Sequence, residues 1–239
     1  NDLSLSSNWD GFSDQYSGIK FYEYAVGTTP GGQDLIPWTN IDSSTSVNIE
    51  SALAHSFTYY TSVRATDLVD NLSNIVTSDG FTIDTIPPTD IFLAESEVGD
   101  PQYQGSDSSI TLFWGANDDL SGIDRYEIAL GTSYGENDFV DWMDLGLTQD
   151  TDTIIDLEDA NTYYGSVRVF DLAGNTALYQ GDGVTVDITP PVAGSVIDGI
   201  DVDNEFMSTE NIEVSWSGFS DDGSGIVAHE YALGTDQDP

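Results

Sequence analysis

The sequence predicts an all-β protein built from tandem β-sandwich domains. A 14-residue phrase, TYYTSVRATDLVDN, begins at Thr58 and returns as TYYGSVRVFDLAGN at Thr162, 104 residues later. A repeat of that length is a whole domain rather than one unit of a solenoid. Short alternating runs separated by turn residues fill each repeat, and a helical period is not sustained anywhere. We therefore expect seven-stranded sandwiches arranged as an elongated array.

The composition limits the partners of the chain. It contains 4 Lys and Arg residues against 43 Asp and Glu residues, a formal net charge of −39. Such a charge repels nucleic acid and anionic membrane surfaces, and it attracts cations. Cysteine is absent, which excludes disulfides and thiolate metal sites. No apolar run approaches the ~20 residues of a membrane span, so we expect a soluble segment without nucleic-acid partners or membrane insertion.

The first strands of the repeat occur three times. Each copy has a strand that ends in tryptophan, then an acidic loop with glycine, then a second strand. The tryptophan strands cover residues 3–9, 109–114 and 212–217, and we expect Trp9, Trp114 and Trp216 to lie in the core. The loops cover residues 11–19, 115–123 and 218–226. The strands that follow cover residues 21–28, 125–132 and 229–235.

The later strands occur only twice. Residues 34–41 match 138–145, and residues 79–88 match 182–191. Between these segments each copy has a short alternating run, residues 46–53 in the first copy and 152–159 in the second. The last pair ends in two prolines, which do not continue a hydrogen-bonded ladder and therefore indicate domain boundaries. We predict a domain over residues 1–88 that lacks its first strand, a complete domain over 89–191, and the first three strands of another over 192–239. A segment of a longer tandem array explains this pattern.

These motifs resemble the fibronectin type III family of immunoglobulin-like sandwiches. Leu157 precedes Tyr163 by six residues, and Leu53 precedes Tyr59 in the same way, as at the tyrosine corner of such sandwiches. The phrases VRATDLVDN and VRVFDLAGN resemble the F strand and the F–G loop of bacterial members. The linkers DTIPP and DITPP are similar to those of giant bacterial surface adhesins. The resemblance implies a fold, and it says little about function.

Carboxylates that recur in register are the candidate metal ligands. They lie in the loop after the tryptophan strand, in the F–G loop and just before the proline pairs. The candidates are Asp14, Asp118, Asp119, Asp221 and Asp222 in the first loop, Asp67, Asp171 and Asn175 in the second, and Asp84 and Asp187 in the linkers. Hard oxygen ligands of this kind suit Ca²⁺. In the topology that the resemblance implies, each linker passes beside both loops of the next domain, and we expect Ca²⁺ to stiffen these junctions. The alternative is that the residues are turn acids that bond their own backbone.

Two further recurring features have structural interpretations. Glu23 with Arg64, and Glu127 with Arg168, are expected to form cross-strand ion pairs, because their strands are neighbours in this fold. Trp38 and Trp142 align between the repeats. They are expected to pack at the sheet edge, although an exposed aromatic there could also stack on a sugar.

The sequence gives little basis for catalysis. His55 and His229 occupy different places in the repeat, and no Ser/His/Asp arrangement is indicated, so we expect no enzymatic activity. We predict a stalk or filament segment of a long, secreted bacterial cell-surface adhesin. Its partners would be neighbouring repeats, other copies in a filament and an unknown surface ligand or glycan. The alternative is a carbohydrate-binding or accessory sandwich module of a secreted polysaccharide-degrading enzyme.

Overall fold

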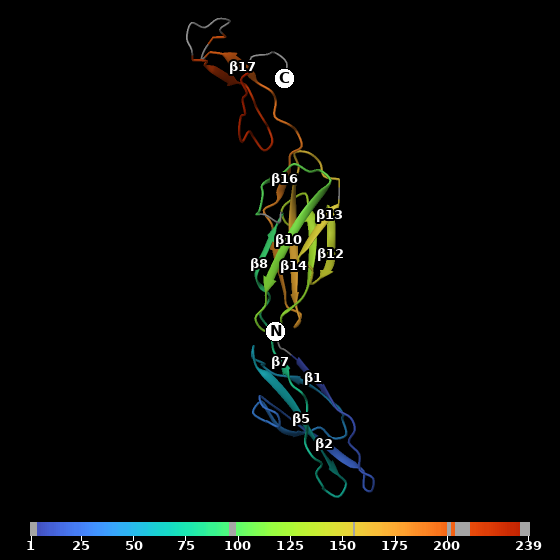
Figure 1. The fold of residues 1–239 in the computed structure, drawn as a ribbon. Helices are drawn as coiled ribbons and strands as arrows, with labels where there is room; N and C mark the ends of the chain where they lie inside the picture. Colours follow the sequence, from blue (N-terminus) through green and yellow to red (C-terminus); the bar gives the residue numbers. More distant parts are fainter. Residues whose placement is uncertain (1–3, 96–98, 155, 200–201, 204–210, 235–239) are drawn as a thin grey trace. The chain divides into compact units, whose positions relative to one another are not determined.

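The computed structural model describes residues 4–95, 99–154, 156–199, 202–203 and 211–234. Every regular element in these ranges is a β-strand, as Figure 1 shows, so the predicted all-β fold class is confirmed. In the same ranges no helix is long and apolar enough to cross a membrane.

The chain divides into two compact units. The first comprises residues 1–88 together with the loops 118–123 and 170–176, and the second comprises 89–117, 124–169 and 177–239. The loops that carry Asp118, Asp171 and Asn175 therefore group with the segment that carries Asp84. The predicted division at residues 88 and 191 stays a prediction.

The first unit contains two sheets. One pairs β1 with β4, and the other has the order β3-β2-β5-β6, with β7 also paired to β5. The strands are β1 Ser4–Asn8, β2 Ile19–Gly27, β3 Ile36–Asn40, β4 Ser46–Glu50, β5 Thr58–Asp67, β6 Val76–Thr77 and β7 Phe81–Thr82. Apolar side chains from both sheets form the core, with Val26, Ile49 and Tyr59 buried at its centre. Burial alternates along β4, where Val47 and Ile49 are the less exposed residues, as expected for a sandwich strand with one face on the core.

The second unit has a fuller sandwich. One sheet has the order β13-β10-β8, and the other has the order β12-β11-β14-β16-β9, with β15 also paired to β14. The strands are β8 Thr89–Ala94, β9 Tyr103–Gln104, β10 Ser109–Asn117, β11 Ile123–Gly131, β12 Val140–Gly146, β13 Asp150–Ile154, β14 Thr162–Asp171, β15 Thr176–Gln180 and β16 Val184–Val186. Residues 89–191 thus have nine described strands rather than the expected seven, because residues 181–183 interrupt the last strand and β9 adds a short parallel pair.

The two sheets of the second unit enclose a core of large side chains. Trp114 of β10 is 1% exposed and meets Tyr126 of β11 edge to face, with the ring centroids 6.4 Å apart. Leu93 of β8 lies so close to Gly165 of β14 that a Cβ there would be 2.8 Å from its Cδ2. A larger residue at this position would require the Leu93 side chain to shift.

Both expected tyrosine corners are formed. The Tyr163 hydroxyl accepts a hydrogen bond of 2.9 Å from the backbone N–H of Glu158, and Tyr163 itself is buried. In the first unit the Tyr59 hydroxyl accepts a bond of 3.0 Å from the backbone N–H of Ala54. The Leu-to-Tyr spacing in the sequence therefore predicted a real feature of both sandwiches.

The described residues beyond 191 form one two-stranded sheet, β17 Ser195–Asp198 with β18 Val214–Ser217. Trp216 is 41% exposed, so its expected place in a core is wrong. The ring stacks on Tyr231, but no second sheet in this segment covers it. The strand expected over residues 229–235 is wrong for residues 229–234, which form no strand in the structure. Residue 235 lies outside the described ranges.

Candidate cation site of the linker and loops

Asp84 connects the end of the first sandwich to two loops of the same compact unit. It lies two residues after β7, and its side chain is 2% exposed. One carboxylate oxygen, Oδ1, accepts from the backbone N–H of Ile86 at 3.1 Å, and Oδ2 accepts from the backbone N–H of Ser121 at 3.1 Å. Burial opposes ionisation, but bonds from Ser121 and Ile86 and the nearby His55 outweigh it, so the pKa of Asp84 is lowered.

Asp118 closes the first of these loops. Its Oδ1 atom accepts hydrogen bonds from the backbone N–H groups of Ser121 at 2.9 Å and Gly122 at 2.6 Å. Gly122 has a φ of +83°, a left-handed conformation that a side chain would strain. The sequence DDLSG therefore folds back on its own first carboxylate, in the manner of other Asp-initiated turns.

Asp171 and Asn175 close the second loop and bind the linker. Asp171 is 2% exposed and accepts from Asn175 through both oxygens, from the backbone N–H at 2.7 Å and from Nδ2 at 2.7 Å. The same Nδ2 group donates to the carbonyl oxygen of Asp84 at 3.2 Å. One amide thus joins the loop acid to the linker backbone.

Asp84, Asp118 and Asp171 together form what we call the linker cluster. One carboxylate oxygen of each lies within 4.8 Å of the others. The sequence therefore predicted an assembly of acids that the structure brings together, with Asn175 beside them. The local hydrogen bonds that the turn-acid interpretation expects are also present, because Asp118 and Asp171 bond their own loops. Oxygen ligands at this spacing suit a hard cation such as Ca²⁺.

The other predicted ligands do not join a group of three acids within the described residues. Asp14 accepts from the N–H groups of Ser17 and Gly18, and Asp67 accepts from Asn71, which lowers the pKa of both carboxyls. These are the same loop closures as in the linker cluster.

The second linker repeats one contact of the first. Asp187 accepts from the backbone N–H of Ser224 at 2.5 Å, and bonds from this serine lower the pKa of Asp187. Asp221 accepts from the N–H of Gly225 at 2.7 Å. Asp119 and Asp222 are exposed at the surface beside these loop acids.

Two residues of the site were not predicted. Ser121 presents the N–H group that holds Asp84, and its recurrence as Ser224 in the SGI phrase of the loops was a usable signal. His55 was not among the expected ligands. Its Nδ1 atom accepts from the backbone N–H of Thr85 at 3.2 Å and lies 3.5 Å from Asp84 Oδ1. No repeat of His55 exists to reveal it.

The recurring Glu–Arg pairs are confirmed, and each includes a tryptophan. Arg64 Nε donates to Glu23 Oε2 at 2.7 Å, and the guanidinium lies 4.3 Å from the ring centroid of Trp38.

In the second unit Arg168 Nη1 donates to Glu127 Oε2 at 3.0 Å, and the guanidinium carbon lies 4.0 Å from the ring centroid of Trp142. One face of each indole is therefore covered by a guanidinium group. This favours the packing interpretation of these tryptophans over sugar stacking.

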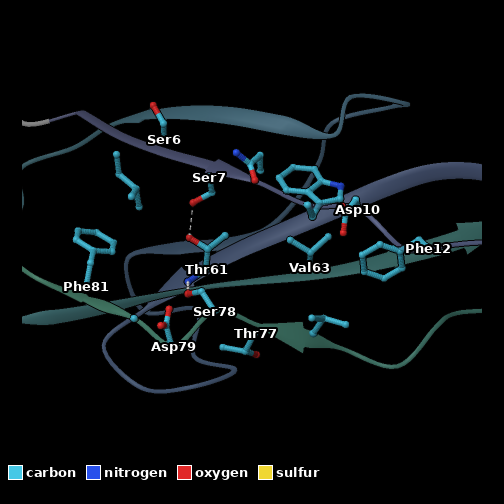
Figure 2. Close-up of a pocket in the computed structure, with 15 residues that line it drawn as sticks. Ser6, Ser7, Asp10, Phe12, Thr61, Val63, Thr77, Ser78, Asp79 and Phe81 are labelled. Atoms are coloured by element: carbon cyan, nitrogen blue, oxygen red, sulfur yellow. Dashed lines mark hydrogen bonds between the residues drawn. The ribbon is translucent and has the colours of Figure 1, made fainter.

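A groove of about 490 Å³ lies beside β1 in the first unit (Figure 2). Three hydroxyl side chains line its floor. The hydroxyl groups of Ser7 and Thr61 are hydrogen-bonded at 2.8 Å, and the backbone N–H of Thr61 donates to Ser78 Oγ at 3.0 Å. In the second unit the corresponding residues are Leu112, Gly165 and Gly181, and β8 lies against them. Within the described residues β1 pairs only with β4, so the groove is an open sheet edge. Its titratable lining residues are Asp10 and Asp79, and no histidine lines it.

Comparison with known proteins gives one partial relative. No family model matches the chain. Chitinase A1 of Niallia circulans is 27% identical over 168 residues, which cover 69% of this chain and 22% of the chitinase. The chain thus spans about a fifth of the length of this curated relative.

Two solved structures to which the chain is similar contain fibronectin type III domains. The FN1-FN3 domains of chicken CNTN1 match with 17% identity and a TM-score of 0.37, over 74% of this chain and 62% of that one. The fibronectin(III)-like modules of Clostridium thermocellum CbhA match with 12% identity and a TM-score of 0.42, over 78% and 86%. The two tyrosine corners agree with the resemblance stated from the sequence motifs.

Proposed function

We propose that this chain is a non-catalytic accessory segment of an extracellular polysaccharide-degrading enzyme, where its sandwiches space and hold other parts of the protein. The observation that carries the proposal is the likeness to chitinase A1 over 168 residues, which involves only 22% of that protein. A segment that matches so small a share of an enzyme suits an accessory role.

The local structure supports a spacer rather than a sugar-binding surface. Trp38 and Trp142 each have one face against an arginine, and a pyranose ring could stack on that face only by displacing the guanidinium. The linkers are held by hydrogen bonds that the backbone N–H groups of Ser121 and Ser224 donate to the carboxylates of Asp84 and Asp187. Repeated contacts of this kind fix how a linker leaves its sandwich, which is useful in a spacer.

The test uses the complete reading frame and its product. We expect a glycoside hydrolase domain in the same polypeptide. Deletion of residues 1–191 should lower hydrolysis of insoluble chitin or cellulose while hydrolysis of a soluble oligosaccharide is unchanged. The isolated 239-residue chain should release no sugar. Hydrolysis by the chain alone, or equal loss on soluble and insoluble substrates, would contradict the proposal.

The stalk of a bacterial adhesin is the second candidate. The repeated linker contacts and the net charge of −39, which keeps neighbouring fibres apart, favour it. A reading frame with many further sandwich units and no hydrolase would support the stalk and exclude the enzyme module.

We also propose that the linker cluster takes up Ca²⁺ and thereby stiffens the linker in either setting. Asp84, Asp118 and Asp171 supply carboxylates, and Asn175 already binds the linker carbonyl. The expected result is slower proteolysis near Asp84 in Ca²⁺ than in chelator for the wild type, and no such difference for Asp118→Asn. Equal protection of both proteins would refute the calcium role and leave the spacer proposal intact.

A further inference from the structure

A second acidic group, outside all the residues predicted from the sequence, lies in the second unit. It consists of Glu95, directly after β8, Asp100 in the following loop, and Asp182 between β15 and β16. One carboxylate oxygen of each lies within 4.8 Å of the others. Asp100 and Asp182 are exposed, whereas Glu95 is 4% exposed. We call these three residues the strand-end cluster.

The Glu95 carboxylate is buried without a partner. Neither Oε1 nor Oε2 receives a hydrogen bond, and both atoms are inaccessible to solvent. The group lies against the backbone of Gly181, where a Cβ atom would be 2.7 Å from Oε1. Burial raises the pKa of Glu95 to about 8, and the neighbouring carboxyls of Asp100 and Asp182 add to this effect. A buried polar group without a partner is costly, so something must compensate it.

The chain itself has no basic side chain for this purpose. All four of its lysine and arginine residues form ion pairs with other acids. The pairs are Lys20–Asp70, Arg64–Glu23, Arg125–Asp124 with Glu127 and Asp144, and Arg168–Glu127. The compensating charge at Glu95 therefore comes from solution, as a proton or as a metal ion.

We propose that the strand-end cluster is a Ca²⁺ site. Ligand oxygens on opposite sides of a calcium ion, each at about 2.4 Å, are about 4.8 Å apart, so oxygens within that spacing converge on one ion. Glu95 supplies the buried ligand, and the exposed Asp100 and Asp182 leave the outer side open to water molecules, which Ca²⁺ accepts among its ~6–8 ligands.

The position gives the ion a structural role. Glu95 ends the first strand of the sandwich, and Asp182 lies in the last strand, at its interruption. An ion between them would connect the first strand of the sandwich to the last.

Part of the arrangement recurs in the following segment. The Asp198 N–H donates to Asp203 Oδ1 at 3.2 Å, as the Glu95 N–H donates to Asp100 Oδ1 at 3.4 Å.

The test measures calcium binding and thermal unfolding of the 239-residue chain. Asp118→Asn is the background for every protein compared, so that the linker cluster does not contribute. In this background, Ca²⁺ should bind and raise the unfolding temperature. Adding Glu95→Gln, which keeps the shape of the side chain and removes its charge, should lower the affinity at least tenfold and abolish the shift. Asp182→Asn should do the same, and it is a surface change that leaves the core untouched.

Asp79→Asn is the matched control. Asp79 occupies in the first unit the place of Asp182, and it should leave binding and the shift unchanged. The proposal is overturned if the background protein shows no calcium effect at millimolar concentration, or if Glu95→Gln and Asp182→Asn retain it. A stability that depends on pH but not on Ca²⁺ would also overturn it, because the proton would then be the compensating charge.

Discussion

Glu95→Gln should make the second unit more stable at neutral pH when calcium is removed. The wild-type carboxyl is 4% exposed and has two carboxylates beside it, which is why its pKa is raised from 4.5 to about 8. A glutamine of the same shape carries no charge, and its amide group donates to Asp100 and Asp182, which only accept. The substitution therefore replaces repulsion by hydrogen bonds.

The sign and size follow from the pKa difference. The folded protein binds the Glu95 proton more tightly than the unfolded chain does, so the stability from this residue is complete below pH 4.5 and is lost as the pH rises to about 8. At ~1.4 kcal/mol for each pH unit, the wild type loses roughly 3 kcal/mol between pH 4.5 and pH 7. Because glutamine does not titrate, the variant should lack this loss.

The assay is calorimetry of both proteins in chelator between pH 4.5 and pH 8. The difference in unfolding temperature between variant and wild type should grow with pH, by an amount on the order of 10 °C for a domain of about 100 residues. Amide exchange in Thr89–Ala94, the strand that ends at Glu95, should localise the effect to this edge. Parallel pH profiles for the two proteins would refute the reasoning, since they would show that Glu95 does not titrate in this range.

Three further outcomes are expected. Tyr163→Phe removes the hydroxyl that accepts from the backbone N–H of Glu158, and it should cost about 0.5–1.5 kcal/mol in urea unfolding; an unchanged midpoint would mean that water replaces the bond. Arg168→Lys keeps the charge but loses the planar contact with Trp142, so it should shift the tryptophan emission and lower stability by about 0.5–1 kcal/mol, and an identical spectrum would contradict the stacking. Asp84→Asn removes a carboxyl whose pKa is lowered in the folded protein, so its charge stabilises the fold above pH 3.8 and this stabilisation is lost as the pH falls. The variant should show a smaller acid dependence of unfolding, with linker stability reduced by about 1 kcal/mol at pH 7. Coincident acid titrations of the two proteins would argue against a role for this charge.

The cluster at the linker could be predicted because it uses residues that recur. Asp118 and Asp171 repeat in register with Asp14 and Asp67, and the fold that the tyrosine spacing implies brings their loops beside the linker. Their hydrogen bonds are local, between an acid and the next few residues, so turn chemistry in the sequence predicts them.

The strand-end cluster could not be predicted in the same way. Glu95 and Asp182 are 87 residues apart and belong to different sheets, and nothing in their neighbours marks one as buried. Gly181 makes room for the carboxyl, while in the first unit the same place is held by Ser78. Only the packing of β8 against β14 and β15 decides that a glutamate there has no solvent and no partner.

The sequence by itself determined the all-β fold, the strand order implied by its repeats, the cross-strand Glu–Arg pairs and the acids of the loops. These depend on short spacings and on a period that the chain repeats. The tertiary structure alone decided that Trp216 is exposed, that arginines cover Trp38 and Trp142, and that Glu95 is buried beside two other acids. Exposure and electrostatic environment depend on which distant strands cover a side chain, and a local pattern carries no information about that.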